Sequence, residues 1–135
     1  MVVIMVIIPI RTSVQAEFVD ITGLVKDEVK KNKWADGVIY IYIPHTTAAV
    51  TINENADPAV QADMLDALNK LVPVKGAYRH SEGNSDAHIK ASLIGSSVVV
   101  IVESGNPVLG RWQGIFFCEF DGPRQREIYL KFSGT

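Results

Sequence analysis

The sequence predicts an α+β fold: one domain spanning residues 1–135, with a mixed and largely antiparallel sheet core and helices packed on it. Segments typical of strands and of helices follow one another without the regular β–α–β alternation of parallel sheets. Turns typical of antiparallel strand pairs concentrate in the last third of the chain. Neither a GxGxxG loop nor a Walker loop occurs in the sequence, so a doubly wound nucleotide-binding fold is not indicated.

The first eight residues are wholly apolar and rich in valine and isoleucine, which predicts a strand, with Pro9 at its end, at a bulge or on a sheet edge. This run is too short to span a bilayer, and it has no basic segment or cleavage site of a signal peptide. Because an unpaired strand this apolar would aggregate, we expect it to be covered inside the fold or by another subunit.

In the first half of the chain, Thr22 is a suitable cap for a helix that continues to about Asn32. Apolar residues at positions 21, 25 and 29 form one stripe on this helix. The run 38–43 is apolar or aromatic on both faces, as expected of a central strand, and the run 50–54 alternates like a half-buried one.

A second helix is predicted from Pro58, capped by Asp57, to about Leu71, with a buried stripe at positions 60, 64, 68 and 71. An extended run is expected over 77–82, and then a helix that ends at Gly95. The remaining segments are expected to be strands: a buried one over 97–103, a pair from 108 that is interrupted at 110–114 and continues over 115–120, and a closing one over 127–132.

The formal net charge of −2 provides no general electrostatic attraction for nucleic acid or an anionic membrane, and we expect neither as a partner. Cys118 is the single cysteine, which excludes an internal disulfide and a CxxC metal or redox site. It lies in an apolar run, where a buried inert thiol is more usual than a nucleophile. This cysteine content suits a reducing, cytoplasmic location.

The stretch 80–88, HSEGNSDAH, is the densest in chemistry, because it contains two of the three histidines. On a strand, His80 and Glu82 would point to the same side, and His88 would follow close to a helix start capped by Asn84 or Ser85. This pattern is compatible with a metal site and, at the exposed N–H groups of the helix start, with a phosphate site. The alternative is a solvated strand pair followed by an ordinary helix cap.

Two further groups are candidates on local grounds. The loop residues His45, Thr46 and Thr47 precede small alanines and are compatible either with a pocket wall or with a polar turn. Trp112 lies between glycines, which permits a flat ligand to stack on it, or a role as a core or interface aromatic. Asp63 is better explained as part of the solvent side of its helix than as a catalytic acid.

Four motifs in this order, at 45–54, 80–88, 110–115 and 118–124, resemble those of the YjbQ family, also called the secondary thiamine-phosphate synthase family. The likeness runs from about Thr12 to the C-terminus. It implies a compact α+β fold, a homotrimer with sites near subunit contacts, and a thiamine-phosphate synthase activity, either primary or secondary to another role. That reaction joins a pyrimidine diphosphate to a thiazole phosphate with loss of pyrophosphate.

The suspected metal ligands of that family correspond here to His45, His80 and His88. We expect a divalent metal on them, with Glu82 or Asp86 as a further ligand. Three imidazoles favour zinc, with magnesium or manganese as alternatives that prefer oxygen ligands.

The remaining roles under this hypothesis concern the substrate. The turn Gly83, Asn84 and Ser85, together with Arg111 or Arg124, would bind phosphate, and Thr46 and Thr47 would line the pocket. Trp112 would stack on the heterocycle, and Gln113 would contact its edge.

A zinc-type site suits activation of water better than departure of pyrophosphate, which leaves two alternatives open. One is a metal-dependent hydrolase of a small substrate, with His80 in the site and Glu82 or Asp63 as general base. The other is a trimeric protein that binds a small molecule or metal without turnover.

Overall fold

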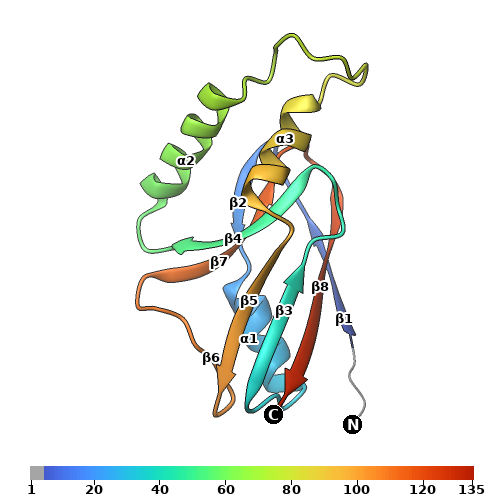
Figure 1. Cartoon of the computed structure of the whole chain (residues 1–135). Coiled ribbons are helices and arrows are strands. Elements are labelled where there is room, and N and C mark those ends of the chain that lie inside the picture. The colour runs from blue at the N-terminus through green and yellow to red at the C-terminus, as the bar shows by residue number, and fades with distance from the viewer. Residues whose placement is uncertain (1–4) are drawn as a thin grey trace.

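The computed structural model describes residues 5–135, in which eight strands and three helices occur (Figure 1). In chain order these are β1 (Met5–Arg11), β2 (Glu17–Asp20), α1 (Thr22–Lys31), β3 (Gly37–Tyr42), β4 (Ala48–Glu54), α2 (Pro58–Leu71), α3 (Ser85–Ile94), β5 (Ser97–Glu103), β6 (Asn106–Pro107), β7 (Gln113–Glu119) and β8 (Gln125–Gly134).

The strands form two antiparallel sheets, a five-stranded one in the order β1-β8-β3-β5-β6 and a three-stranded one in the order β2-β7-β4. The predicted α+β class with a largely antiparallel core is therefore confirmed. The closing strand is longer than predicted, because β8 pairs with β1 and β3 along most of its length. No helix within the described residues is both long and apolar enough to cross a membrane.

Helix α1 covers the inner face of the five-stranded sheet. Its stripe of Ile21, Val25 and Val29 is buried against Ile39 and Ile41 of the central strand β3, as predicted from the periodicity.

The start of α1 differs from the prediction, because Thr22 is the first helical residue and Ile21 occupies the cap position. The Asp20 carboxylate performs the capping function, since it accepts hydrogen bonds from the Thr22 N–H at 2.9 Å and from Thr22 Oγ1 at 2.6 Å.

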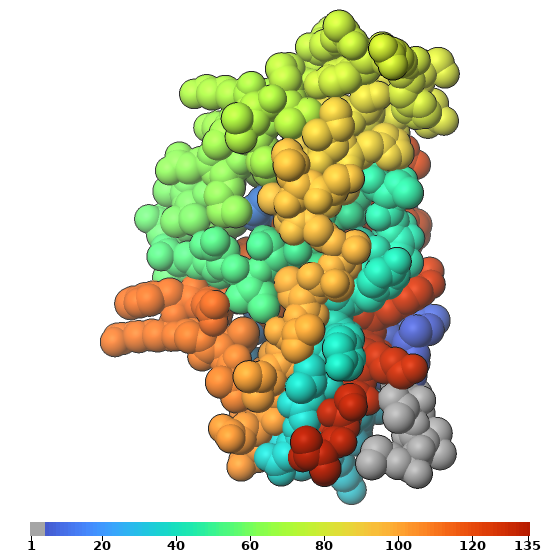
Figure 2. Space-filling model, in the orientation of Figure 1, coloured from blue at the N-terminus to red at the C-terminus, as the bar shows by residue number. Residues whose placement is uncertain are grey.

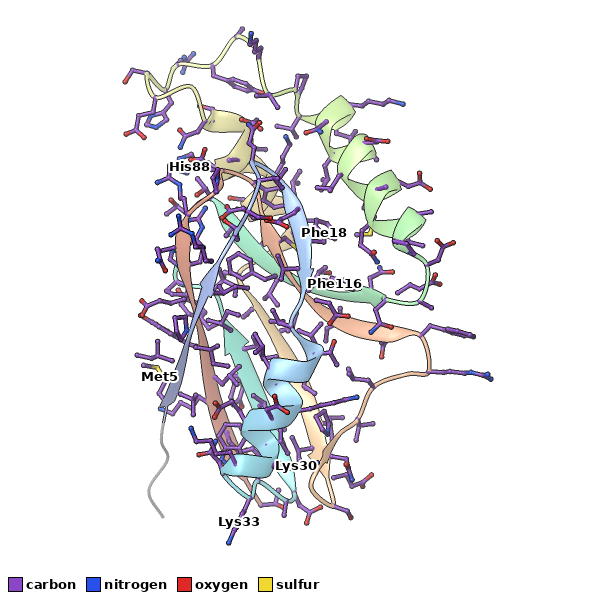
Figure 3. All side chains as sticks on the ribbon, turned by 180° about the vertical axis from the view of Figure 1, so that it is seen from behind. Met5, Phe18, Lys30, Lys33, His88 and Phe116 are labelled. Carbon is purple, nitrogen blue, oxygen red and sulfur yellow. The ribbon has the colours of Figure 1, made fainter. Side chains whose placement is uncertain are left out.

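A second apolar cluster lies beneath α3. The small side chains of Ala87 and Ala91 let this helix approach the three-stranded sheet, where they meet Phe116 and Cys118. The ring of Phe18 lies 6.2 Å from that of Phe116, centroid to centroid (Figure 3). Burial raises the pKa of the Cys118 thiol well above its ordinary value, which agrees with the expected inert thiol.

The predicted buried stripe of α2 is wrong at its end. Asp57 caps this helix through the Ala59 N–H, at 2.9 Å, and Pro58 begins it, as predicted. Within α2, however, only Leu68 is buried, and Leu71 is 75% exposed. The reason is that α2 stands beside the sheets and contacts the second cluster through one narrow edge (Figure 1).

The predicted extended run over 77–82 is also wrong. These residues lie in an irregular segment that joins α2 to α3 and ends in a turn at 81–83, with Gly83 at a φ of 77°. No strand among the described residues pairs with this segment, so nothing stabilises an extended backbone here. His80 and Glu82 therefore do not share a strand face.

The hairpin after β5 is tight. Ser104 and Gly105 form a two-residue turn with φ angles of 50° and 79°. Two positive φ angles give a turn whose twist matches that of the flanking antiparallel strands, and glycine adopts such angles readily. β6 comprises only Asn106–Pro107, and the predicted strand from 108 does not form.

One face of the five-stranded sheet is uncovered in the single chain, and we call it the outer sheet face. It consists of the exposed apolar side chains of Met5, Ile7, Tyr40, Tyr42, Val99 and Ile101. Figure 2 shows β3, β5 and β8 at the surface on the side that faces the viewer. The prediction of a fully buried strand over 97–103 is thus wrong for alternate residues. The predicted first strand is confirmed from Met5 on, with Pro9 inside an edge strand, whereas residues 1–4 lie outside the described range.

Candidate functional site

A pocket of about 460 Å³ lies where the ends of both sheets meet the start of α3, and we call it the histidine pocket. The β3–β4 loop, the turn before α3 and the segment between β7 and β8 all contribute to it. Its lining residues are Pro44, His45, Thr46, Thr47, His80, Glu82, Asn84, His88, Asp121, Arg124 and Arg126. The three histidines of the sequence therefore line one cavity, although 35 positions separate the first from the second.

The β3–β4 loop is held in place by backbone contacts. Pro44 cannot donate to a sheet ladder, and β3 ends just before it. The Thr47 carbonyl accepts a hydrogen bond from the Phe120 N–H at 3.2 Å, which joins the loop to the segment after β7. His45 and Thr46 are thus fixed at the pocket wall.

His80 and His88 lie beside each other, with ring centroids 5.5 Å apart and ring planes at 87°. His88 belongs to the first turns of α3, and Figure 3 shows it at the end of the molecule opposite Lys30 and Lys33. Glu82 Oε2 is 3.8 Å from His80 Nε2. The side chains of His80 and Glu82 are both exposed, so water screens the attraction between them.

His45 has a different environment, because its Nε2 accepts a hydrogen bond from the backbone N–H of Glu127 at 2.9 Å. Burial, followed by the positive charge of Arg126, holds the pKa of His45 below its ordinary value, against the opposing effects of a backbone contact with Glu127 and of the Glu119 and Glu127 carboxylates. His45 is therefore neutral at neutral pH.

Arg126 is a fixed cation at the pocket floor. It is 6% exposed and donates through Nε to Glu119 Oε1 at 2.8 Å, through Nη2 to Glu119 Oε2, and through Nη2 to Thr47 Oγ1 at 2.8 Å. Burial alone would raise the pKa of Glu119, but hydrogen bonds from Arg126, Thr12 and the Asp121 N–H outweigh it and hold that pKa below its usual range. Glu119 therefore stays ionised and keeps Arg126 in place.

Asp121 joins the start of α3 to Arg124. Its Oδ2 accepts hydrogen bonds from Asn84 Nδ2 at 2.8 Å and from Arg124 Nη2 at 3.0 Å. Asn84 occupies the cap position of α3, as predicted, but its side chain makes no capping hydrogen bond. The predicted position is therefore right, and the predicted capping contact is wrong. Asn84 Oδ1 is buried and has no hydrogen-bond partner among residues 5–135.

The histidine pocket gathers more than half of the predicted site residues. These are His45, Thr46, Thr47, His80, Glu82, Asn84, His88 and Arg124. Gly83 lies in the turn between two of them, and Ser85 lines an adjoining cavity of about 550 Å³ together with His80 and His88.

The other predicted residues lie elsewhere in the single chain. Arg111 and Trp112 belong to the segment that projects between β6 and β7, and Gln113 is the first residue of β7 (Figures 1 and 2). They are at the far end of the three-stranded sheet, where Gln113 pairs with Glu54, the last residue of β4. The pocket is at the other end of β4, about 20 Å away at the usual rise of a strand per residue. Trp112 is 55% exposed, with the Arg111 guanidinium 5.0 Å from its ring centroid. Asp63 is exposed on α2 and does not line the pocket, as its assignment to the solvent side of the helix predicted.

Sequence reasoning missed Pro44, Asp121, Arg126 and the buried Glu119. A signal for two of them exists, because Glu119 and Arg126 each place a charge in a run of otherwise apolar inward positions. Two buried charges of opposite sign in consecutive strands of the chain are expected to pair.

The three histidines share one pocket, but their arrangement here does not by itself make up a metal centre. Among residues 5–135, no group of three His, Cys, Asp or Glu side chains is placed to hold a metal ion. One reason is that the lone pair of His45 Nε2 already accepts the Glu127 N–H. We therefore assign no chemical step to zinc, magnesium or manganese, and a bound metal stays a prediction.

Comparison with known proteins identifies close relatives. The family model described as "UPF0047 protein YjbQ-like" matches residues 7–135. A UPF0047 protein of Methanocaldococcus jannaschii is 53% identical over 125 residues, which cover 93% of this chain and 91% of the relative. The UPF0047 protein YugU of Bacillus subtilis is 49% identical over 126 residues, which cover 93% and 96%.

Solved structures agree with the fold. An uncharacterised YjbQ/UPF0047 family protein of Clostridium acetobutylicum has a TM-score of 0.92 at 52% identity and covers 95% of this chain and 99% of its own. A protein of unknown function from Sulfolobus solfataricus, described as YbjQ-like, has a TM-score of 0.93 at 33% identity and covers 98% of both chains.

Proposed function

Because this chain belongs to the YjbQ-like family of UPF0047 proteins, we propose that its histidine pocket catalyses the condensation that the sequence resemblance implies. The substrates are a pyrimidine diphosphate and a thiazole phosphate. The thiazole nitrogen forms a bond to the methylene carbon of the pyrimidine, and the carbon–oxygen bond to the diphosphate breaks. The products are thiamine phosphate and pyrophosphate.

One observation carries this proposal, namely that two arginines and three histidines line one pocket of ligand size. Pyrophosphate departs with the electron pair of the broken bond, so negative charge grows on its oxygens. Fixed cations and N–H donors stabilise such charge without having to reorganise. Arg126 is held in place by Glu119, and Arg124 lies at the pocket edge, partly balanced by Asp121.

A second cavity supports a reaction between two substrates. It has a volume of about 500 Å³ and shares His45, Thr46 and His88 with the histidine pocket. Ala48, Ala91 and Gly95 leave space along its wall, and its described lining contains no arginine, lysine, aspartate or glutamate. A heterocyclic ring without phosphate contacts suits this cavity, while the phosphate groups occupy the arginine side.

The hydrolase alternative has less support in the chain. Asp63 does not line the pocket, which leaves the exposed Glu82 as its general base. The non-catalytic alternative shares the pocket but consumes no substrate.

We also propose the homotrimer that the resemblance implies. The outer sheet face supports it, because strand register places Ile7, Tyr129 and Tyr42 in one row across β1, β8 and β3. Exposed apolar surface of this kind is typical of protein interfaces. A second copy of this chain has the same face available.

Product analysis tests the catalytic proposal. The purified protein is incubated with both substrates, with either one alone, and with and without divalent metal, and the products are separated chromatographically. Formation of thiamine phosphate only when both substrates are present supports condensation. Release of phosphate or pyrophosphate from one substrate in water supports the hydrolase, and no consumption of either supports the binding protein.

A further inference from the structure

His45 lies just beyond the end of β3. It is opposite the backbone N–H of Glu127 in β8, which has no partner in β3. The register of β3 with β8 ends at the pair Tyr42 and Tyr129, and Glu127 lies two residues further along β8. Pro44 turns the chain out of the sheet. The His45 ring therefore takes the place of a ladder carbonyl, and its Nε2 accepts the Glu127 N–H at 2.9 Å.

This contact determines which nitrogen of His45 carries the proton. A nitrogen that accepts a hydrogen bond carries no hydrogen, so the single proton of the neutral ring is on Nδ1. A doubly protonated ring would place Nε2–H directly against the N–H of Glu127.

We propose that His45 is a neutral hydrogen-bond donor to the bound substrate through Nδ1–H, and that it is not a metal ligand. The contact with Glu127 occupies Nε2, and the ring lines both the histidine pocket and the second cavity of about 500 Å³. A metal at Nε2 would displace the Glu127 N–H. A metal at Nδ1 would force the proton onto Nε2, toward that same N–H.

The acceptor that fits this donor is a phosphate oxygen, because Arg124 and Arg126 line the same pocket. Only this identification of the acceptor rests on the proposed function. The protonation of the ring and the exclusion of His45 as a ligand rest on the contact with Glu127.

Nuclear magnetic resonance tests the protonation directly. Long-range ¹H–¹⁵N correlation of the uniformly ¹⁵N-labelled protein distinguishes the two neutral forms of histidine, and the spectrum of His45→Asn assigns the His45 signals. We expect the Nδ1–H form at pH 7, unchanged when zinc is added. An Nε2–H form, a charged ring at pH 7, or a His45 nitrogen signal that shifts to a metal-bound value would overturn the proposal.

Two variants test the donor role with pyrophosphate as probe. The amide of His45→Asn lies near the position of Nδ1 and can still donate there, whereas the amide of His45→Gln reaches the position of Nε2 instead. Calorimetry at pH 7.5 is expected to show pyrophosphate binding weakened about tenfold in His45→Gln, the loss of one hydrogen bond to a charged group, and clearly less in His45→Asn.

Equal affinity in the wild type and His45→Gln would remove the donor role. No binding of pyrophosphate to the wild type would contradict the proposed function as well, and the resonance experiment would then still decide whether His45 is a metal ligand.

Discussion

Glu119 and Arg126 form an ion pair inside the protein, where the glutamate is fully buried and the arginine is only 6% exposed. The glutamate also accepts hydrogen bonds from Thr12 Oγ1 at 2.7 Å and from the N–H groups of Phe120 and Asp121. Its carboxylate thereby joins the end of β1, the end of β7 and the pocket side of β8. The pair fixes the position of the one buried cation in the pocket lining.

Substitution of this glutamate is expected to destabilise the fold. Glu119→Gln leaves the Arg126 charge buried without its counterion, which typically costs about 3 to 5 kcal/mol of unfolding free energy. Denaturant unfolding monitored by circular dichroism measures the change. The exposed Glu103→Gln serves as control and should change stability little. A loss below about 1 kcal/mol in Glu119→Gln would contradict this account.

The same pair predicts how stability depends on pH. The pKa of Glu119 is lower in the folded than in the unfolded chain, so its contribution is complete above the unfolded value of about 4.3. That contribution is lost as the pH falls from there through the folded-state pKa, because the unfolded chain binds the proton first. Unfolding free energies measured between pH 6 and pH 2.5 should therefore fall less steeply in Glu119→Gln than in the wild type. Parallel curves would show that this carboxylate does not contribute to acid sensitivity.

Cys118 is expected to take no part in catalysis. Its side chain is fully buried, and a raised pKa keeps the thiol protonated. A disulfide reagent such as DTNB should modify it only after denaturant is added, and Cys118→Ser should turn over substrate at the wild-type rate. Rapid modification of the native protein, or loss of turnover with the fold intact, would contradict this assignment.

The outer sheet face predicts the assembly. Light scattering should give about three times the chain mass of 14.8 kDa for the wild type. Ile101→Glu places a charge on this face and should give a monomer, because burying an unpaired carboxylate is unfavourable. Leu24→Glu adds the same charge on α1, which covers the inner face, and should leave the trimer intact. A trimer that persists in Ile101→Glu would exclude this face as the interface.

Local sequence patterns predicted those elements whose ends are fixed by short-range chemistry. Asp57 and Pro58 determine the start of α2, and Gly95 determines the end of α3. The apolar run over 97–103 did not reveal that Val99 and Ile101 are exposed, because a strand buried on both faces and one with an uncovered apolar face have the same sequence pattern.

The candidate site was predictable only in part. The motifs around His45 and His80 named most residues of the pocket, because their composition is unusual. Arg126 was missed although a signal for it exists, because recognising its pairing with Glu119 requires reading the inward positions of two separate strands together. Arg111 and Trp112 were expected beside the histidines, but the length of the three-stranded sheet separates them in one chain.

The most direct test of the proposed function is the rate of thiamine phosphate formation in Arg124→Gln compared with Lys30→Gln. Both changes remove one positive charge, but Arg124 lines the histidine pocket, whereas Lys30 lies at the opposite end of the molecule (Figure 3). We predict a rate at least about tenfold lower in Arg124→Gln, as expected when a charged hydrogen bond to the leaving group is lost, and the wild-type rate in Lys30→Gln. Equal rates in the two variants, or no thiamine phosphate from the wild type, would contradict the assignment of this reaction to the histidine pocket.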